Sequence, residues 1–576
     1  MLDPISAIKN PQALLETAAQ TTDQATLLEL RRFASGQQGD PWVLAQGFVF
    51  WKLGESSKLI ELLIAKQENL RTTPQYWLLL GLAYREQSLD DLARSCYSRA
   101  LQLDDRRSDI HYNLANILQS DNSTLAEHHY SIALALDPMH HACLHNLAML
   151  YLGQDFFGKA EILLKRALCI DPLNSQAWCN LGLCMFNQDH YFSAEKCFLL
   201  AMALNPRHSQ SCVNLGSLFV SDSKPEIALP LLEQGVKLNP ASNDALFNLG
   251  ICHLLLGRYE TGWNYYQSRL QTKLIPESSI PVKGPIPSTL SELRSCSRLV
   301  VWTEQGSGDT IQFCRYLLLL DQLAINYVFY CPPTMVSLMK EWLSPSGLVC
   351  PFPRSSDPPL TGPNVPLMNM PHLFSTSMST IPSVLPYLSP QSPPPPSLCV
   401  PEPPGGIAIG LAWASNPDNK AMYRHKSLQL KLLMPLLLRL LDLDLADIHV
   451  LQVGVDNQQL DPWRGHPRIF DWQPQLKTFG DTAHVVQQLD LVISVDTALA
   501  HLSAALRRPT WVMLPANADF RWLLDRDDSP WYPGIIRLFR QETRGEWFSV
   551  LNNLQAALDE LFMVDLESLL SSRQNS

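Results

Sequence analysis

Small and large side chains recur through residues 41–270 with a period of 33 or 34 residues. Each period after the first, degenerate one holds a first small residue, then a second one, and a large side chain four positions after the second. Small residues let two helices approach and large ones fill the groove between neighbouring pairs, so the pattern predicts a row of helix pairs. The first small residues are Gly47, Gly81, Ala115, Ala148, Gly182, Gly216 and Gly250. The second are Ala93, Ala126, Ala160, Ala194, Ala228 and Gly262, and the large side chains are Tyr97, Tyr130, Leu164, Phe198, Leu232 and Tyr266.

Prolines close four of these periods, at Pro138, Pro172, Pro206 and Pro240. A proline stops a helix because it lacks an amide donor and clashes with the preceding turn. A helix-turn-helix unit of 34 residues resembles the tetratricopeptide repeat. We therefore predict an α-solenoid of about seven such repeats over residues 41–270, preceded by an N-terminal helical segment over residues 1–40.

An asparagine stands two residues before the first small residue in five consecutive repeats, at Asn113, Asn146, Asn180, Asn214 and Asn248. In a solenoid these side chains would stack as a ladder, and an amide offers both a donor and an acceptor to the backbone of an extended peptide. O-linked N-acetylglucosamine transferases look similar in this respect, since asparagines lining their repeats grip protein substrates. The alternative is that asparagine is common at this repeat position in binding and non-binding repeats alike.

The hydrophobic pattern changes after residue 297, where strands begin to alternate with helices. Residues 271–297 are polar and proline-bearing, which predicts a linker or docking segment. Strand-helix alternation indicates parallel sheets. The expected strands cover residues 298–303, 327–331, 406–413, 448–453, 468–470, 491–495 and 510–514, and the expected helices cover 310–323, 481–489 and 497–505.

Two lobes are predicted from this alternation, residues 298–404 and 405–560, followed by a tail over 561–576. Of the 54 residues from 351 to 404, 17 are proline. Such a segment is extended and forms no regular helix, so we expect it to include the crossing between the lobes.

Charge and composition exclude several classes of protein. The net charge of −11 argues against non-specific binding to nucleic acid or anionic lipid. No basic segment followed by an apolar run opens the chain, and charges and a proline interrupt its most apolar later stretch, 428–445, so neither an export signal nor a transmembrane segment is expected. The 13 cysteines form no C-x-x-C pair and many take core-like helical positions, which favours reduced thiols and a cytoplasmic location. Examples are Cys143, Cys184, Cys212 and Cys252.

Two turns that lead from a strand into a helix carry candidate chemistry. Ligands bind at such turns in open α/β sheets, where free amides and the helix dipole favour an anion such as a phosphate. Asp496 and Thr497 occupy the turn after strand 491–495, and His501 projects from the same side as Thr497. Asp309 follows Gly306-Ser-Gly in the other turn, which is read as a tight loop. An ordinary helix cap at Asp309 and a packing role for His501 are the alternatives.

A basic segment follows strand 406–413 and contains Lys420, Arg424, His425 and Lys426. Cations at the mouth of a cleft could neutralise a diphosphate, and the alternative is a solvated basic loop. No group of histidine, cysteine or carboxylate residues has convincing metal-ligand spacing, and no G-x-S-x-G elbow is present. The sequence therefore predicts neither a metal site nor a serine hydrolase.

Three stretches together resemble glycosyltransferase family 9, the heptosyltransferase-like enzymes: Gly308-Asp309, Val495 to His501, and Arg508-Pro509. The chain is more closely similar to bacterial proteins that join tetratricopeptide repeats to such a domain. Stretches like Glu304 to Phe313, Gly410 to Trp413 and Ser529 to Pro533 are typical of that group. The resemblance implies a GT-B fold of two Rossmann-like lobes, a nucleotide sugar as substrate, and inversion at the anomeric carbon without a metal. It assigns Asp309 as the general base and gives the donor's nucleotide and diphosphate to Asn416, Arg424 or Lys426, Asp496, Thr497 and His501.

One departure concerns Ala498 in the donor site, where heptosyltransferases usually have glycine. A methyl group there restricts how closely a phosphate can approach the backbone. We expect an inverting, metal-independent glycosyltransferase that needs no cofactor and whose repeats recruit a protein or peptide acceptor. The alternative is a non-catalytic repeat scaffold for protein-protein interaction that carries a vestigial sugar-transferase domain.

Overall fold

The computed structural model describes residues 8–272, 275, 280–343, 346–353, 360–403, 406–418 and 420–562. The chain divides between Ser211 and Cys212 into two compact units. Each unit buries apolar clusters of its own.

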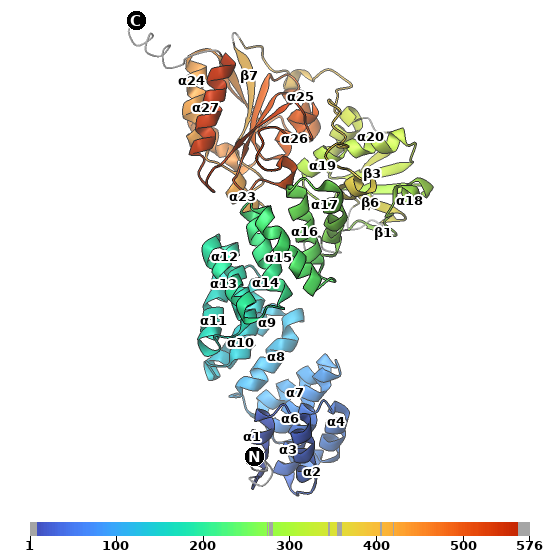
Figure 1. The fold of residues 1–576 in the computed structure, drawn as a ribbon, viewed down its shortest axis with the longest axis vertical. Coiled ribbons are helices and arrows are strands. Elements are labelled where there is room, and N and C mark those ends of the chain that lie inside the picture. Colours follow the sequence, from blue (N-terminus) through green and yellow to red (C-terminus); the bar gives the residue numbers. More distant parts are fainter. Residues whose placement is uncertain are drawn as a thin grey trace. The chain divides into compact units, whose positions relative to one another are not determined.

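The first unit is built from helices that follow one another in pairs (Figure 1). The two helices before residue 40 pack on α3 through Leu14, Leu30 and Val49. The unit contains α1 (Pro11–Gln20), α2 (Gln24–Ser35), α3 (Asp40–Lys52), α4 (Ser56–Ala65), α5 (Gln67–Leu70), α6 (Pro74–Glu86), α7 (Asp90–Leu103), α8 (Ser108–Asp121), α9 (Ser123–Leu136), α10 (His141–Gly153), α11 (Phe157–Ile170), α12 (Ser175–Asn187) and α13 (Tyr191–Leu204).

The small and large residues of the repeat pattern meet inside each helix pair. A Cβ atom on Gly182 would lie 2.6 Å from a ring carbon of Phe198, and one on Gly81 would lie 2.5 Å from the ring of Tyr97. The large side chain therefore packs against the small residue of its own repeat. Cysteines at these positions behave as core residues, and Cys143 and Cys184 are fully buried.

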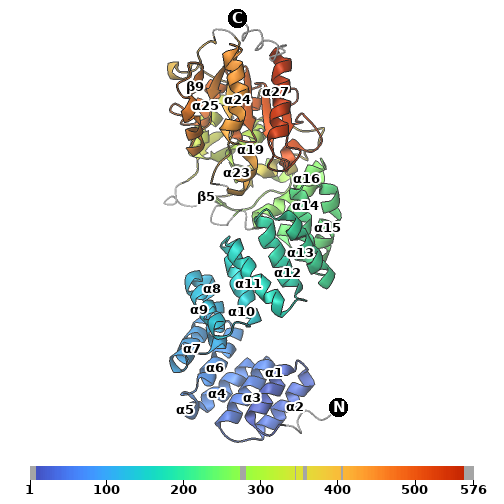
Figure 2. The ribbon, with the colours of Figure 1, turned by 90° about the vertical axis from the view of Figure 1, so that its left-hand side faces the viewer.

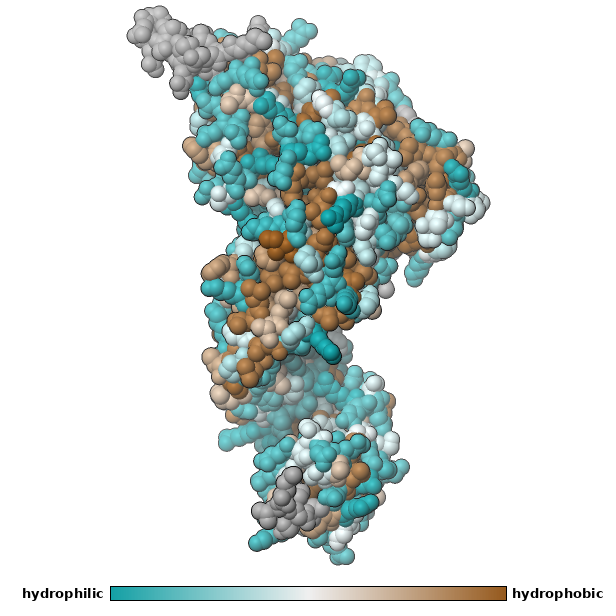
Figure 3. Space-filling model, in the orientation of Figure 1, coloured by the Kyte–Doolittle hydropathy of each residue, from teal (hydrophilic) through white to brown (hydrophobic). Residues whose placement is uncertain are grey.

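Apolar side chains also remain exposed on the repeat helices. Figure 3 shows apolar residues gathered over the helices of the middle repeats. The exposed apolar side chains of α11 and α13 include Ile162, Phe192 and Leu199. Their exposure agrees with repeats that bind another protein.

The second unit opens with helices of the last two repeats. These are α14 (Ser209–Ser221), which contains the division between the units, α15 (Pro225–Leu238), α16 (Asn243–Leu255) and α17 (Tyr259–Tyr266), followed by the 3₁₀ turn η1 (Gln267–Gln271). Tyr259, Trp263 and Tyr266 of α17 belong to the same buried cluster as the first parallel strands. The final helix of the repeats is thus part of the core of the α/β region.

A four-stranded parallel sheet follows, with the order β4-β3-β2-β6. Its strands are β2 (Leu299–Trp302), β3 (Tyr327–Cys331), β4 (Leu348–Pro351) and β6 (Asn364–Pro366). Between β2 and β3 lie α19 (Ser307–Phe313) and α20 (Arg315–Gln322), where one helix over 310–323 was expected. The expected tight loop at Gly306 to Asp309 was wrong, because α19 already begins at Ser307.

Short elements surround this sheet. The predicted linker contains α18 (Leu290–Ser295) and β1 (Val282–Lys283), which pairs with β5 (Leu360–Thr361), so it docks against the fold. After β3 come η3 (Pro333–Met335), α21 (Val336–Leu338) and η4 (Met339–Leu343).

The prediction that residues 351–404 form no regular helix was wrong. This proline-rich stretch supplies β6, η5 (Leu367–Asn369), α22 (Met370–Leu373) and η6 (Pro396–Leu398). Pro371 fits α22 because the first turn of a helix needs no amide donor from that position.

A six-stranded parallel sheet completes the second unit, with the order β12-β11-β10-β7-β8-β9. Helices α24 and α27 pack on one face and α25 and α26 on the other (Figures 1 and 2). The strands are β7 (Ile407–Ala412), β8 (Ala446–Val450), β9 (Ile469–Asp471), β10 (Leu491–Val495), β11 (Thr510–Leu514) and β12 (Ile536–Arg540). The helical elements are α23 (Lys420–Lys426), α24 (Leu430–Asp442), η7 (Val455–Trp463), α25 (Phe479–Val486), α26 (Ala498–Ala505), η8 (Phe520–Trp522) and α27 (Phe548–Phe562).

Successive residues of the inner strands point to opposite faces of the sheet and are buried in two different apolar clusters. Ala408 and Val492 face the α25 and α26 side, whereas Ile409 and Ile493 face the α24 and α27 side. Burial on both faces is what parallel sheets require, and it explains why these strands read as continuous apolar runs. The expected tetratricopeptide-like helices and parallel α/β sheets are therefore confirmed.

Candidate active site

The candidate residues lie at two strand ends, one in each parallel sheet. β2 ends at Trp302 and β10 ends at Val495. The strand order reverses between β2 and β6 in the smaller sheet and between β7 and β10 in the larger one. Ligands of open parallel sheets bind beyond the carboxyl ends of the strands at such reversal points. Asp309 follows β2 and Asp496 follows β10, so both occupy positions where a ligand is expected.

The two helices that begin at these strand ends touch each other. A Cβ atom on Gly308 of α19 would lie 3.1 Å from Cδ2 of His501 and 3.5 Å from Cα of Ala498, both in α26. The absence of a side chain at Gly308 therefore allows the two helix starts to approach. The backbone nitrogen of Ala498 lies 3.6 Å from the same point, so an anion at this helix start would have α19 as its neighbour.

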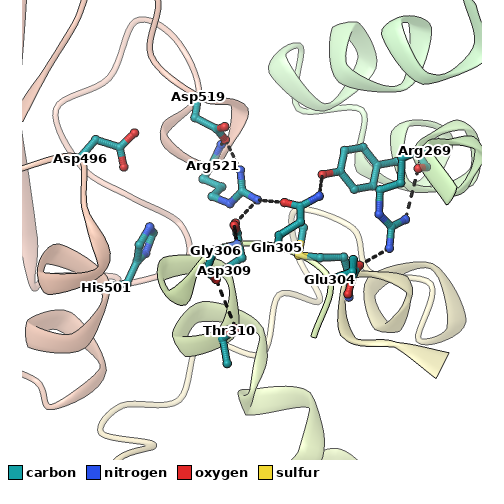
Figure 4. Close-up of polar contacts among 12 residues, drawn as sticks. Arg269, Glu304, Gln305, Gly306, Asp309, Thr310, Asp496, His501, Asp519 and Arg521 are labelled. Atoms are coloured by element: carbon teal, nitrogen blue, oxygen red, sulfur yellow. Dashed lines mark hydrogen bonds and ion pairs between the residues drawn. The ribbon is translucent and has the colours of Figure 1, made fainter. Parts of the chain in front are cut away.

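Asp309 has a partner on each side of its carboxylate (Figure 4). The backbone N–H of Gly306 donates to Oδ2 at 3.2 Å, and Arg521 forms an ion pair with Oδ1. The side chain is 22% exposed. Burial raises the pKa of Asp309, and the charge of Arg521 offsets only part of this effect. The carboxylate thus caps its own helix and also faces a buried cation.

Sequence reasoning missed Arg521, which is the centre of the polar cluster in Figure 4. It lies on η8 beyond β11 and is 7% exposed. Besides Asp309 it pairs with Asp519 at 2.6 Å, and its Nη2 lies 3.4 Å from Oε1 of Gln305. Its guanidinium also lies over the Phe520 ring, 4.4 Å from the centroid. Only folding brings this arginine to α19, so no sequence spacing signalled it.

Asp496 forms the second ion pair of the cluster. Lys426 Nζ lies 2.6 Å from its Oδ2, and Asp496 is 7% exposed. Burial acts to raise the pKa of Asp496, but Lys426, together with His501 and Trp522, outweighs burial, and the pKa lies below its ordinary value. The interpretation of residues 420–426 as a loop was wrong, because they form α23, whose last residue reaches this strand end. Lys426 is therefore paired with Asp496.

His501 is 4% exposed and packs among aromatic side chains. Its Nδ1 lies 3.0 Å from the Tyr532 hydroxyl, and its ring stacks on Trp522 with the centroids 5.0 Å apart. Burial lowers the pKa of His501 to about 3, so the ring is neutral at ordinary pH. These contacts suit the packing alternative, and the predicted contact with the donor stays a prediction.

The remaining predicted donor residues lie nearer the surface. Thr497 is half-buried, and its hydroxyl lies 3.0 Å from that of Ser494. Asn416 is exposed and accepts a hydrogen bond from the Asp418 backbone at 3.1 Å. Arg424 is exposed on α23.

The charges of the buried cluster do not balance. Asp309, Asp496 and Asp519 contribute three carboxylates, against the two cations Lys426 and Arg521, so the formal charge is −1. A diphosphate adds further negative charge. It can bind here only by taking a cation from a carboxylate or by meeting cations nearer the surface.

The end of the repeats also reaches this cluster. Gln305 donates to the Tyr266 hydroxyl at 2.8 Å, and Arg269 forms a buried ion pair with Glu304. Glu304 also accepts from the Met368 backbone at 3.2 Å, directly after β6. The residues between β2 and Asp309 are therefore held by the last repeat helix and the turn that follows it.

The five asparagines of the predicted acceptor ladder lie on the first helices of their repeats. Asn113 and Asn248 each donate to the carbonyl four residues earlier at 2.8 Å. Asn146 donates to a side-chain oxygen of the preceding repeat at 2.7 Å, and Asn180 is 5% exposed. Asn214 is half-buried. Their contact with an acceptor stays a prediction.

A cavity of about 390 Å³ lies between α17 and α22, and none of the cluster's residues lines it. Its lining includes Glu260, Trp263, His372 and Thr376. Across the described ranges, no group of three or more histidine, cysteine, aspartate or glutamate side chains is placed to hold a metal ion. Among the same residues, no helix is long and apolar enough to span a membrane.

Segments of this chain match two protein families. Residues 74–106 and 213–268 match tetratricopeptide repeats. Residues 476–513 match glycosyltransferase family 9 (heptosyltransferase). The family 9 match covers α25, β10, α26 and most of β11. Asp496 and His501 lie inside this match, and Asp309 and Arg521 lie outside it. The matches support a glycosyltransferase that carries repeats, and the repeats indicate protein binding.

Solved structures similar to the chain include helical-repeat proteins. YrrB, described as a TPR protein with an unusual peptide-binding site, is 19% identical over 32% of this chain and 97% of its own, with a TM-score of 0.30. The pilF protein of Pseudomonas aeruginosa is 20% identical over 36% of this chain and 94% of its own, with a TM-score of 0.31. The APC/C Cut9–Hcn1 hetero-tetramer gives 16% identity over 48% and 56%, with a TM-score of 0.37. Curated proteins gave no match.

Proposed function

We propose that the second unit transfers a sugar from a nucleotide sugar to an acceptor that the repeats recruit, a protein or a peptide. One observation carries this proposal: Asp309 at the end of β2 and Asp496 at the end of β10 interact electrostatically within one cluster of charged side chains at the reversal points of two parallel sheets. The family 9 match over residues 476–513 supports it from the sequence of β10 and α26. A GT-B arrangement of two Rossmann-like lobes is part of the proposal.

In the proposed reaction, the Asp309 carboxylate takes the proton of the acceptor hydroxyl while that oxygen bonds to the anomeric carbon. The bond from this carbon to the donor diphosphate breaks on the opposite face, and its electron pair leaves with the nucleoside diphosphate, so the configuration inverts. The raised pKa of Asp309 supports the role, because a base works best with a pKa nearer the working pH. Lys426 and Arg424 would meet the charge of the leaving group in place of a metal, with the amides at the start of α26.

One observation favours the second candidate, a repeat scaffold with an inactive sugar domain. Both buried cations already pair with carboxylates, which leaves the cluster with a formal charge of −1. A site that never binds a diphosphate would keep this arrangement permanently. The cytoplasm, expected from the cysteine pattern, remains the proposed compartment.

Calorimetric titration of the whole chain with a panel of nucleotide sugars separates the two candidates. The transferase predicts that at least one member binds, with affinity falling about tenfold or more in Lys426→Met, since a buried charge contact to the ligand is lost. Lys431→Met, at an exposed position in the first turn of α24, is the matched control and should bind as the wild type does. Absence of binding by a protein that melts cooperatively would support the scaffold.

A further inference from the structure

Arg521 holds the carboxylate that the proposed reaction needs as a base. It bridges Asp309 and Asp519 and is almost fully buried. A carboxylate bound to a guanidinium is a weaker proton acceptor, because the cation stabilises its charged form. The ion pair with Arg521 therefore weakens Asp309 as a base.

We propose that Arg521 is a donor-operated clamp: the diphosphate of the donor takes this guanidinium from Asp309 and so releases the carboxylate to act as the base. The inference rests on the proposed function and adds to it an order of events, with donor binding before proton transfer. Arg521 becomes a donor-binding residue that sequence reasoning did not identify.

The position of Arg521 supports the exchange. η8 follows β11, the neighbour of β10 in the larger sheet, whereas Asp309 belongs to α19 beside the smaller sheet. The ion pair with Asp309 thus joins the two sheets across the contact of α19 with α26. Arg521 also forms an ion pair with Asp519, two residues earlier. This second ion pair would hold the side chain in position after the ion pair with Asp309 breaks.

The donor group fits the guanidinium by shape and by charge. Arginine presents a planar fork of donors that matches phosphate oxygens in pairs. Its Nε atom is buried and has no hydrogen-bond partner among the described residues, so the guanidinium is not fully satisfied by its present contacts. Charge supports the same outcome, because a cluster with a formal charge of −1 accepts a diphosphate only if the phosphates replace a carboxylate as the partner of a cation.

Release of Arg521 would change Asp309 in the direction that catalysis needs. Burial already raises its pKa, and Arg521 is the largest opposing influence. Without that cation the pKa rises further, and the carboxylate becomes a stronger acceptor for the proton of an acceptor hydroxyl. Before the donor arrives, the clamped carboxylate is a poor base.

The clamp predicts that loss of the base strengthens the binding of nucleoside diphosphates. Asp309→Asn removes the competitor for Arg521, so this variant should bind the diphosphate about fivefold to tenfold more tightly than the wild type although its turnover is lost. Loss of charge repulsion alone would tighten binding by the same factor with or without Arg521, so the double variant distinguishes the two causes. The probes are UDP, GDP, CDP and ADP, titrated calorimetrically into the whole chain.

Two further variants complete the cycle. Arg521→Gln should weaken binding about thirtyfold, because a buried charge contact to the ligand is lost. In the double variant the Asp309→Asn change should no longer tighten binding, because the cation for which both compete is absent. Arg521→Lys keeps the charge if the glutamine variant fails to fold. Arg537→Met, which breaks the exposed pair with Glu560, is the matched control and should bind as the wild type does.

The outcomes separate the two levels of the proposal. Tighter binding by Asp309→Asn that disappears in the double variant supports the clamp. Equal or weaker binding by a folded Asp309→Asn variant overturns the clamp and leaves the transferase standing. If the folded wild type binds none of the four diphosphates, the transferase falls and the clamp falls with it.

Discussion

Gly308 sets the distance between the two helices that carry the candidate residues. With hydrogen in place of a side chain, α19 approaches α26 until a Cβ atom would lie 3.1 Å from the His501 ring. That contact is shorter than ordinary packing allows, so even a methyl group at 308 would move the neighbouring atoms. The same closeness brings Asp309 to the larger sheet, where Arg521 reaches it.

Replacement of Gly308 by valine should therefore damage both stability and turnover. Overpacking of this contact costs about 1–3 kcal/mol, and separation of the helices would pull Asp309 away from Arg521. Thermal unfolding and release of nucleoside diphosphate are the measurements. Gly465→Val is the control, since a Cβ atom there would have no neighbour within 4 Å. A Gly308→Val variant as stable and as active as this control would contradict the account.

Prediction from sequence succeeded for residues whose position depends on their own strand or helix. Asp309 and Asp496 were placed at strand ends because continuous apolar runs identify buried strands and the helix begins directly afterwards. Arg521 was missed and Lys426 was expected to be available to a ligand. Their partners lie far away in sequence, and a single sequence carries no signal for such a pair.

At the scale of elements, α17 and η1 are part of the core of the α/β region, although α17 completes the repeat pattern. The Nε1 atom of Trp531 donates to the Tyr259 hydroxyl at 3.1 Å, and Trp263 packs edge-on against Phe520 beside Arg521. The large aromatic side chains of the atypical last repeat were the sequence signal that this helix packs against another part of the chain. What lay against them could not be predicted, because the contact joins residues separated by 272 positions.

The buried pair of Arg269 and Glu304 should be the most sensitive link in this contact. Arg269→Met leaves an unpaired carboxylate in the core and should cost about 3–5 kcal/mol at neutral pH. Burial raises the pKa of Glu304, and Arg269 offsets part of that rise. Without the arginine the folded-state pKa lies higher still, so the folded protein binds the proton more readily than the unfolded chain and is relatively more stable at low pH.

The stability deficit of Arg269→Met should therefore shrink as the pH falls and grow as the pH rises through the folded pKa of Glu304. Denaturant unfolding at a series of pH values measures it. The double variant Arg269→Met/Glu304→Met removes both charges and should recover most of the loss. A deficit that is the same at every pH would show that Glu304 is not an unpaired charge in the single variant.

Missed elements have the same physical explanation as missed residues. The four-residue helix α22 and the short strand β6 lie in a proline-rich stretch, where composition indicated extended chain. Strand β12 reads as an alternating pattern that ends with Arg540 and was not recognised. The conformation of these short elements depends on the sheets against which they pack. Helix α24 and the inner strands instead have a pattern of apolar residues that is visible in the sequence.

At the scale of the whole molecule, the repeats and the α/β sheets were both predictable. A period of 33 or 34 residues is rarely produced by chance, and strand-helix alternation left only a parallel sheet. The division between Ser211 and Cys212 was not predicted, because the repeat pattern continues through it without change. The last two repeats therefore have two roles, one in the solenoid and one in the core of the second unit.

Release of nucleoside diphosphate from a nucleotide sugar is the most direct test of the central claim, that the Asp309 cluster is the active site of a glycosyltransferase. The whole chain is assayed with each donor of the panel, alone and with candidate protein acceptors. Asp481 provides the matched control for Asp309, because its carboxylate also accepts a backbone N–H three residues earlier at the start of a helix, that of Thr478. We predict release by the wild type, a loss of about a hundredfold or more in Asp309→Asn, and activity close to the wild type in Asp481→Asn. Equal activity in Asp309→Asn and the wild type would contradict the account.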